Sequence, residues 1–149
     1  MVATFGGAGY LPKAPGTWGS IVAVGIYAVL GTFISHSDHL TYTLIALITA
    51  TYLAGLWSIG KVKEEWGSDP SRVVIDEACG IFVTMLPVTY SLTNALLGLV
   101  LFRVFDIWKP LGIRKIDQME SHNGHTVMLD DVAAGIYAAV VLGCINLWL

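Results

Sequence analysis

Stretches without a charged residue or a histidine occupy most of the chain, and short charged segments separate them. Each stretch is close to the ~20 residues that a helix needs to cross the ~30 Å hydrocarbon core of a bilayer. There are four of them, at Ala14 to Ser35, Leu40 to Gly60, Ala78 to Phe102 and Val132 to Leu149. The pattern predicts long apolar helices, most simply membrane-spanning ones.

The third stretch is expected to fold back instead of crossing. Four simple crossings would place the charged loops 61–77 and 103–131 on opposite faces, although both are rich in Lys and Arg, which favour the cytoplasmic face. Pro87 offers the break, because proline lacks an N–H and disfavours helical geometry at the residue before it. We therefore predict a helical hairpin, with one arm from about Val73 to Leu86 and the other from about Ser91 to Trp108.

The predicted architecture is all-α: one multi-pass membrane bundle over residues 1–149, with about five helical segments, its N-terminus in the cytoplasm and its C-terminus outside. All Lys and Arg residues then lie on the cytoplasmic face, together with every acidic residue except Asp38. Composition agrees, since 55% hydrophobic and 13% charged residues lie outside ordinary soluble usage. A soluble bundle of buried helices is the alternative that composition leaves open. Cys79 and Cys144 lack metal-type spacing and are expected to be buried thiols.

The first hairpin arm begins with "DPSRVVIDEACG" (69–80), which carries two adjacent carboxylates. Asp69 and Pro70 suit the N-cap and first position of a helix. Asp76 and Glu77 would then lie two turns in, against an apolar run, where an ionised carboxylate is costly unless it is paired or bound to metal. A charged collar at the membrane surface is the simpler interpretation of this pair.

The second arm ends in "FRVFDIWKP" (102–110), in which Arg103, Asp106 and Lys109 recur at i, i+3 and i+6 on one stripe of the helix. An intrahelical salt bridge would explain this trio without any function. The segment "VMLDDVAAG" (127–135) places Asp130 and Asp131 in what we expect to be the first turn of the last helix, where the helix dipole favours anions.

Coincidence argues against these separate explanations, because all of the carboxylates are predicted to reach the same depth on the same side. Without a cation they would repel one another strongly. Hard oxygen ligands suit Mg²⁺, which keeps waters for a phosphorylated substrate. The predicted metal ligands are Asp76, Glu77, Asp106, Asp130 and Asp131.

A second candidate element is "LPKAPGTWGS" (11–20), which combines two prolines, two glycines, a Thr and a Ser just before the first apolar helix. Free backbone N–H groups and hydroxyls at a helix N-terminus can hold an anion, although an ordinary capped helix start is equally compatible. We expect Gly16, Thr17, Ser20 and Arg72 to contact a phosphate, with arginine matching its geometry best.

These blocks together resemble the phosphatidylglycerophosphatase A family of small bacterial inner-membrane lipid phosphatases. The resemblance rests on "APGTWGS" (14–20), "SRVVIDEACG" (71–80), "FRVFDIWKP" with "IRKID" (102–117) and "VMLDDVAAG" (127–135), in the family's order and spacing. It implies Mg²⁺-dependent removal of the terminal phosphate of phosphatidylglycerol phosphate, which gives phosphatidylglycerol. The family also includes soluble all-α relatives, so the resemblance does not exclude a soluble bundle.

Two departures from the family pattern are expected to affect substrate preference more than the reaction class. The chain has "SHNGHTVMLDD" (121–131) where a glycine-richer "GGxGxMLDD" is typical, and Lys13 where an apolar or aromatic residue is common. We interpret His122 and His125 as loop residues instead of catalytic groups.

The expected mechanism is metal-assisted hydrolysis at the cytoplasmic membrane surface. Glu77 is our choice of general base, Asp76 and Asp106 are catalytic metal ligands, and Arg103 and Lys109 offset charge on the phosphoryl oxygens. Trp18, Trp66 and Trp108 are expected at interfacial depth. The partners are a phospholipid substrate and the membrane, with no nucleic acid.

The strongest rival is a small divalent-cation transporter or channel subunit that uses the same carboxylates. It should carry charge deep inside the apolar runs, whereas this chain has charge only at their ends. Cysteine-phosphatase and aspartyl-phosphate chemistry find no matching motif, because neither cysteine has an Arg six positions later and no Asp-x-Asp occurs.

Overall fold

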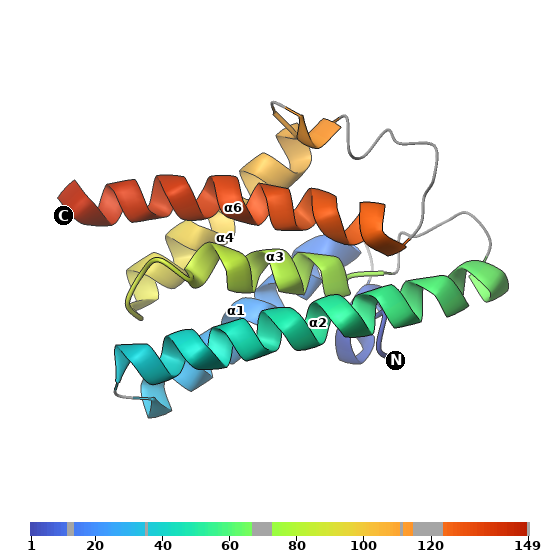
Figure 1. The fold of residues 1–149 in the computed structure, drawn as a ribbon, viewed down its shortest axis with the longest axis horizontal. Helices are drawn as coiled ribbons and strands as arrows, with labels where there is room; N and C mark the ends of the chain where they lie inside the picture. The colour runs from blue at the N-terminus through green and yellow to red at the C-terminus, as the bar shows by residue number, and fades with distance from the viewer. Residues whose placement is uncertain (12–13, 35, 67–72, 111, 115–123, 149) are drawn as a thin grey trace.

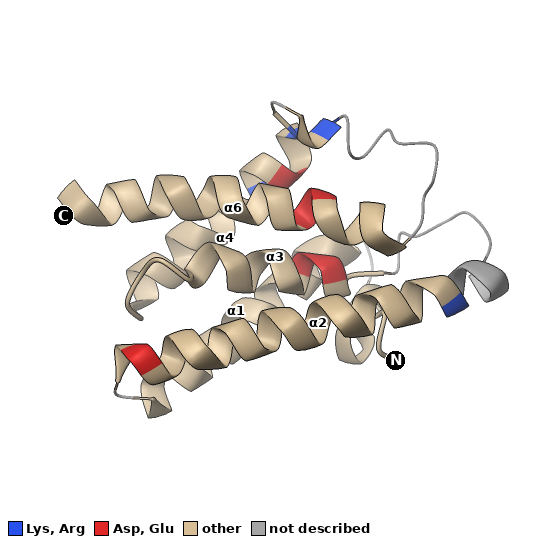
Figure 2. Ribbon diagram, viewed as in Figure 1, with Lys and Arg blue, Asp and Glu red and all other residues tan. Residues whose placement is uncertain are grey.

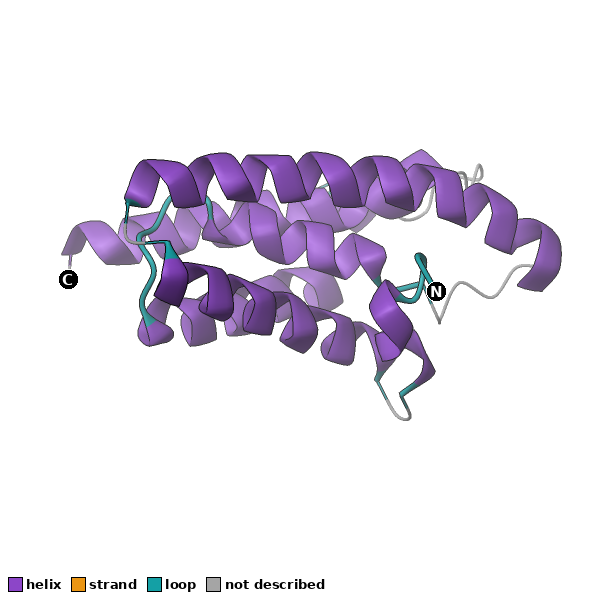
Figure 3. Cartoon of the chain, turned by 90° about the horizontal axis from the view of Figure 1, so that it is seen from below, coloured by secondary structure: helices purple, strands orange, loops and turns teal. Residues whose placement is uncertain are grey.

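The computed structural model is an all-helical bundle over the part of the chain that it describes, with no strand there (Figure 1 and Figure 3). It describes residues 1–11, 14–34, 36–66, 73–110, 112–114 and 124–148, without the side chains of 62–66. The elements are η1 (Phe5–Tyr10), α1 (Pro15–Phe33), α2 (Ser37–Trp66), α3 (Ile75–Met85), α4 (Leu92–Trp108) and α6 (Gly124–Trp148). The predicted all-α class is therefore confirmed.

Three helices are long and apolar enough to cross a membrane: α1, α2 as far as Lys61, and α6. Many large apolar side chains on these helices are exposed, among them Val29, Leu53 and Val140, as expected for surfaces that contact lipid. The helices α3 and α4 are not among the candidate spans. The bundle thus has three candidate membrane-spanning helices, with the α3–α4 hairpin packed against them.

The hairpin forms where the sequence predicts it. Helix α3 ends at Met85, Pro87 lies in the turn, and α4 begins after Ser91, whose hydroxyl accepts a hydrogen bond from the Asn94 N–H at 3.0 Å. This is N-capping, which satisfies one of the backbone donors that a helix leaves free at its start. Proline and the serine cap together explain why the chain reverses here.

Helix α3 is the core of the bundle. Every residue from Ile75 to Met85 is buried except Glu77, and the helix contacts α1, α2, α4 and α6. A helix that is apolar around its whole circumference is stable only when other helices surround it. Because α3 is central, any side chain in its first turn is held in place from several sides.

The backbones of α3 and α6 approach each other closely at two glycines. A Cβ on Gly135 would come 2.5 Å from the carbonyl oxygen of Gly80, and a Cβ on Gly80 would come 2.7 Å from the carbonyl oxygen of Asp131. Small residues let helix backbones approach closely, which is a common device in membrane bundles. The two glycines lie one turn beyond Asp76 and Asp131, so they bring those two aspartates together.

The starts of two helices differ from the sequence expectation. Helix α3 begins at Ile75, so Asp76 and Glu77 lie in its first turn and not two turns in; Asp69 and Pro70, expected to cap it, lie outside the described residues. Helix α6 begins at Gly124, so Asp130 lies about two turns inside it and not in its first turn. The segment "GHTVML" (124–129) extends α6 toward its N-terminus, although it is more polar than the apolar run that begins at Val132.

Charge separates along the bundle. Figure 2 shows the described Lys and Arg residues, and most of the acidic ones, toward the end of the molecule that also holds the N-terminus. Asp38 lies at the opposite end, beside the start of α2. Asp38 is thus set apart from the other described charged residues, whereas their common place on the cytoplasmic face of a membrane stays a prediction.

Candidate active site

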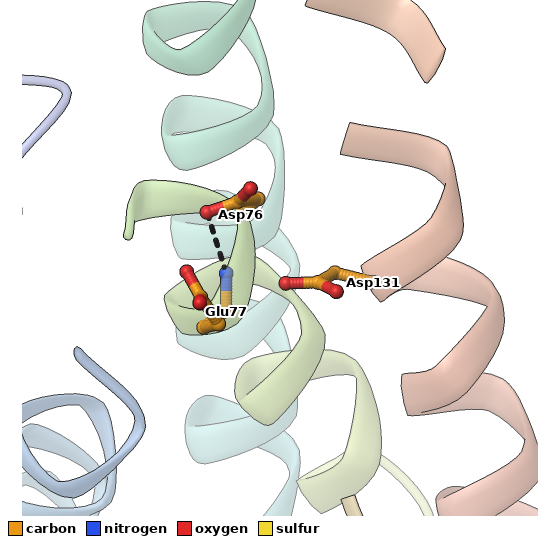
Figure 4. A group of neighbouring side chains, drawn as sticks. All are labelled: Asp76, Glu77 and Asp131. Carbon is orange, nitrogen blue, oxygen red and sulfur yellow. Dashed lines mark hydrogen bonds between the residues drawn. The ribbon is translucent and has the colours of Figure 1, made fainter. Parts of the chain in front are cut away.

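Three carboxylates from two helices meet at the charged end of the core. Asp76 and Glu77 come from the first turn of α3 and Asp131 from α6 (Figure 4). Each offers an oxygen atom, and these atoms lie within 4.8 Å of one another. We call these three residues the carboxylate cluster. Asp76 and Asp131 are only 8% and 5% exposed, so water screens little of their mutual repulsion.

The electrostatics of α3's first turn show what this burial does. Burial raises the pKa of Asp76 to about 6, although hydrogen bonds with Glu77 act in the opposite direction. Burial and the neighbouring Asp76 charge raise the pKa of Glu77 well above its usual value. The N–H of Glu77 donates to Asp76 Oδ1 at 3.1 Å, while Glu77 Oε2 is buried without a hydrogen-bond partner. Among the described residues, this oxygen of the cluster is therefore left without a donor.

Cations stand beside the cluster on α4, each with a carboxylate partner. Arg103 Nη1 donates to Asp106 Oδ2, one turn along the same helix. Lys109 Nζ donates to Asp130 Oδ2 on α6 at 2.7 Å. The salt bridge that the sequence suggested within α4 is thus present for Arg103 and Asp106, whereas Lys109 reaches across to another helix.

The start of α1 completes the surroundings of Glu77. A Cβ on Gly16 would overlap Glu77 Oε1 and lie 3.3 Å from Arg103 Nη1, so a larger residue at this position would displace the Glu77 side chain. Pro15 occupies the first helical position, and no side chain caps the helix. The free N–H groups of this first turn, which include that of Thr17, carry the positive end of the helix dipole. The helix N-terminus therefore lies against both a cluster carboxylate and the Arg103 guanidinium.

The remaining predicted residues divide into described and undescribed ones. Ser20 is buried, but its hydroxyl donates to the Gly16 carbonyl at 2.9 Å and so supports the turn. Arg72 and His122 lie outside the described residues. His125 lies on α6, which corrects its expected place in a loop, and its Nδ1 is 3.3 Å from the Tyr52 hydroxyl of α2.

Two of the three expected interfacial tryptophans are described as exposed, Trp18 at 41% and Trp108 at 66%. The third, Trp66, has no described side chain. The sequence analysis did not single out Gly80 and Gly135. The pattern that could have revealed them is a glycine one helical turn after a carboxylate on each of two apolar helices.

An apolar groove of about 400 Å³ lies between the N-terminal segment, α2 and the start of α3. Ile75, the residue before Asp76, forms part of its wall, and α2 and the N-terminal segment supply the rest. The hydroxyl of Thr51 in this wall donates to carbonyls of its own helix, so it offers the groove little polarity. The groove suits hydrocarbon.

Comparisons with known proteins identify the family of the chain. A family model described as phosphatidylglycerophosphatase A matches residues 1–146. A phosphatidylglycerophosphatase A from Haemophilus influenzae is 33% identical over 145 residues, covering 96% of this chain and 85% of the relative. The protein of the same name from Escherichia coli is 30% identical over 137 residues, covering 91% and 76%.

A putative phosphatidylinositol-3-phosphatase from Bacteroides thetaiotaomicron is 38% identical over 145 residues, covering 95% of this chain and 89% of that protein. No solved structure matches the chain. The match to the family model spans nearly the whole chain and includes every element of the site. The chain therefore belongs to the phosphatidylglycerophosphatase A family and is a phosphatase that acts on a phospholipid.

Proposed function

We propose that this protein removes the terminal phosphomonoester of phosphatidylglycerol phosphate in a Mg²⁺-dependent reaction, giving phosphatidylglycerol and phosphate. The single observation that carries the proposal is the carboxylate cluster, buried beside two cations and a helix N-terminus. We place the reaction at the cytoplasmic face of a bacterial inner membrane, because the charged end of the bundle contains the cluster (Figure 2).

The donor set of the cluster fits Mg²⁺. Carboxylate oxygens are the ligands that this hard cation prefers, and the unpartnered Glu77 Oε2 supplies an acceptor that lacks a donor. Asp76, Glu77 and Asp131 would hold the ion, whereas Asp106 and Asp130 already have cations beside them. When bound, a divalent cation polarises phosphate oxygens and makes water more acidic.

The side chains around the cluster suit a phosphate dianion. Arg103 and Lys109 offset the negative charge that the phosphoryl oxygens carry, and the free N–H groups of Gly16 and Thr17 can donate to those oxygens. Arg103 Nε is buried without a hydrogen-bond partner, so this guanidinium retains a donor for the substrate. Arg72 remains a proposed phosphate contact from its position in the sequence.

Glu77 is the proposed general base. Burial and the neighbouring Asp76 charge raise the pKa of Glu77, so its carboxylate binds a proton more strongly than an exposed glutamate does. Water attacks phosphorus, its proton passes to Glu77, and the bond from phosphorus to the glycerol oxygen breaks. The leaving glycerol oxygen takes up the proton that Glu77 accepted, which regenerates the carboxylate, and hydrogen phosphate is the second product.

The lipid part of the substrate would remain at the membrane. The exposed apolar faces of the spanning helices and the groove beside Ile75 accommodate hydrocarbon, while Trp18 and Trp108 are exposed near the helix ends at the charged side. A phosphate carried by a head group can therefore reach the cluster without removal of the acyl chains from the bilayer.

A second candidate substrate is phosphatidylinositol 3-phosphate, which the name of the 38% identical relative suggests. It presents the same phosphomonoester to the same groups, so the choice concerns the head group alone. Divalent-cation transport, the rival from another class, gains no support from the family.

The test is phosphate release from each lipid in detergent micelles, with Mg²⁺ and with EDTA. We expect release from phosphatidylglycerol phosphate by the wild type, its loss in EDTA, and its loss in Asp131→Asn. Asp38→Asn is the matched control, since it makes the same change at the opposite end of the bundle. Release that continues in EDTA would contradict the metal, and faster release from the inositol lipid would reassign the substrate.

A further inference from the structure

Two adjacent aspartates of α6 have different neighbours. Asp131 belongs to the carboxylate cluster, whereas Asp130 accepts a hydrogen bond from Lys109 Nζ at 2.7 Å. Consecutive side chains on a helix point about 100° apart, so both can be buried and still face different groups. The other oxygen of Asp130, Oδ1, accepts from the Asp131 N–H at 3.1 Å. Asp76 accepts the same kind of bond from the Glu77 N–H, so the contact that sets Asp130 apart is the one with the Lys109 ammonium, whose positive charge competes with a metal ion for the Asp130 carboxylate.

Lys109 holds its position at a conformational cost. It is the C-cap of α4 with φ 47° and ψ 58°, in the left-handed region, and its N–H donates to the Phe105 carbonyl at 2.8 Å. Glycine is the usual residue at such a helix end, because a Cβ is strained there. A strained residue at a site indicates that its side chain is needed at that place. With this backbone conformation, the Lys109 side chain reaches α6, where its ammonium donates to Asp130.

We propose that Asp130 is a positioning residue that acts through Lys109, and not a metal ligand. Lysine carries its charge on four flexible carbons, so an unheld ammonium spends little time in any one place. The Asp130 carboxylate fixes it beside the cluster, where it receives the phosphate. The pair of Arg103 and Asp106 has the same form, a cation of α4 held by a carboxylate. This assignment rests on the proposed function, since it names the role of one residue in that site.

The experiment compares six forms of the purified protein in detergent: wild type, Asp130→Asn, Asp130→Glu, Asp131→Asn, Lys109→Gly and the double variant Lys109→Gly/Asp130→Asn. Lys109→Gly removes the ammonium while giving the helix end its preferred residue. Mn²⁺ binding is counted by electron paramagnetic resonance of the free ion. Binding of inorganic phosphate in the presence of Mg²⁺ is measured by isothermal titration, and lipid turnover by phosphate release. Elution as a single species in gel filtration checks folding.

We expect Asp130→Asn to bind Mn²⁺ within about twofold of the wild type and to bind phosphate about tenfold more weakly, the size of a lost charge-assisted hydrogen bond. Asp131→Asn should lose Mn²⁺. Lys109→Gly should weaken phosphate binding as Asp130→Asn does, and the double variant should be no weaker than either single variant, because the two residues act as a unit. Asp130→Glu, which keeps the carboxylate, should recover most of the phosphate affinity.

Loss of Mn²⁺ in Asp130→Asn, to the extent seen in Asp131→Asn, would overturn the assignment and make Asp130 a ligand. Unchanged or tighter phosphate binding would also overturn it, as would full additivity in the double variant. If the wild type released no phosphate from either lipid, the proposed function would fail. The Mn²⁺ and phosphate binding measurements would still decide the role of Asp130, because neither requires turnover.

Discussion

Helices α4 and α6 are joined by polar side chains at two places, and the two links are built differently. Near the carboxylate cluster the link is ionic, between Lys109 and Asp130. At the other end it is neutral: Asn94 and Asn146 exchange two hydrogen bonds of 3.0 Å through their side-chain amides. The remaining amide hydrogens of the pair donate to the carbonyls of Thr89 and Leu142.

We interpret the neutral link as a stabilising contact and the charged end as the proposed site of the chemistry. The amide pair leaves both side chains well bonded and uncharged, which is how a polar group is tolerated among apolar helices. The charged end has buried atoms without partners, Glu77 Oε2 and Arg103 Nε, and carboxylates that repel one another. A fold gains nothing from such an arrangement unless a ligand completes it, so perturbing the two ends should give opposite results.

The largest expected effect is from Glu77→Gln at the charged end. Turnover should fall at least about 100-fold, because the substitution removes both a metal ligand and the proposed base. Stability in EDTA should stay the same or rise, since one of the repelling charges is gone. Phosphate release and thermal unfolding in detergent measure the two quantities. A variant that lost stability as well as activity would make Glu77 a structural residue.

Gly135→Ala should lower both stability and activity, because the glycine lies where α3 and α6 cross. Its new methyl group would meet the Gly80 carbonyl, and such overpacking costs about 1–3 kcal/mol. Activity should fall too, since Asp131 lies one turn away on the same helix. Gly25→Ala is the control: nothing lies within 4 Å of a Cβ at that position. Equal unfolding temperatures for the two variants would contradict the close crossing.

Asn146→Ala should lower stability by about 1 kcal/mol and leave turnover at saturating substrate unchanged. The substitution removes the hydrogen bonds to Asn94 at a place far from the cluster along α6. Unfolding by a denaturing detergent measures the change, with Thr93→Ala, an exposed position on α4, as the control. Reduced turnover with unchanged stability would show that the amide link also shapes the site.

The smallest expected effect is on the pH dependence of the metal-free protein. Because burial raises the pKa of Asp76 to about 6, the folded state favours the protonated carboxyl more than the unfolded state does. The protonated Asp76 carboxyl therefore contributes to the free energy of unfolding in full below its pKa in the unfolded chain, about 4, and this contribution is lost as the pH rises through 6. The unfolding temperature in EDTA should fall over this window. Asp76→Asn should flatten the profile; an unchanged slope would show that other groups dominate it.

The sequence by itself determined the class and the layout of the fold. Charge-free runs fix which segments are apolar helices, and the cationic bias of two loops, together with Pro87, requires the fold-back that the structure shows. These features can be read from the sequence because, in a membrane bundle, each apolar segment forms its backbone hydrogen bonds within its own helix. The same local blocks also carried the family resemblance and the set of candidate carboxylates.

Only the tertiary structure decided which of those carboxylates meet. Asp130 and Asp131 are indistinguishable in the sequence, yet one joins the cluster and the other holds Lys109. The start of each helix, which sequence reasoning misplaced for α3 and α6, depends on neighbours that support polar residues at its first turn. Helix phase and the close crossing at Gly80 and Gly135 set these pairings, and both arise from packing between segments far apart in the chain.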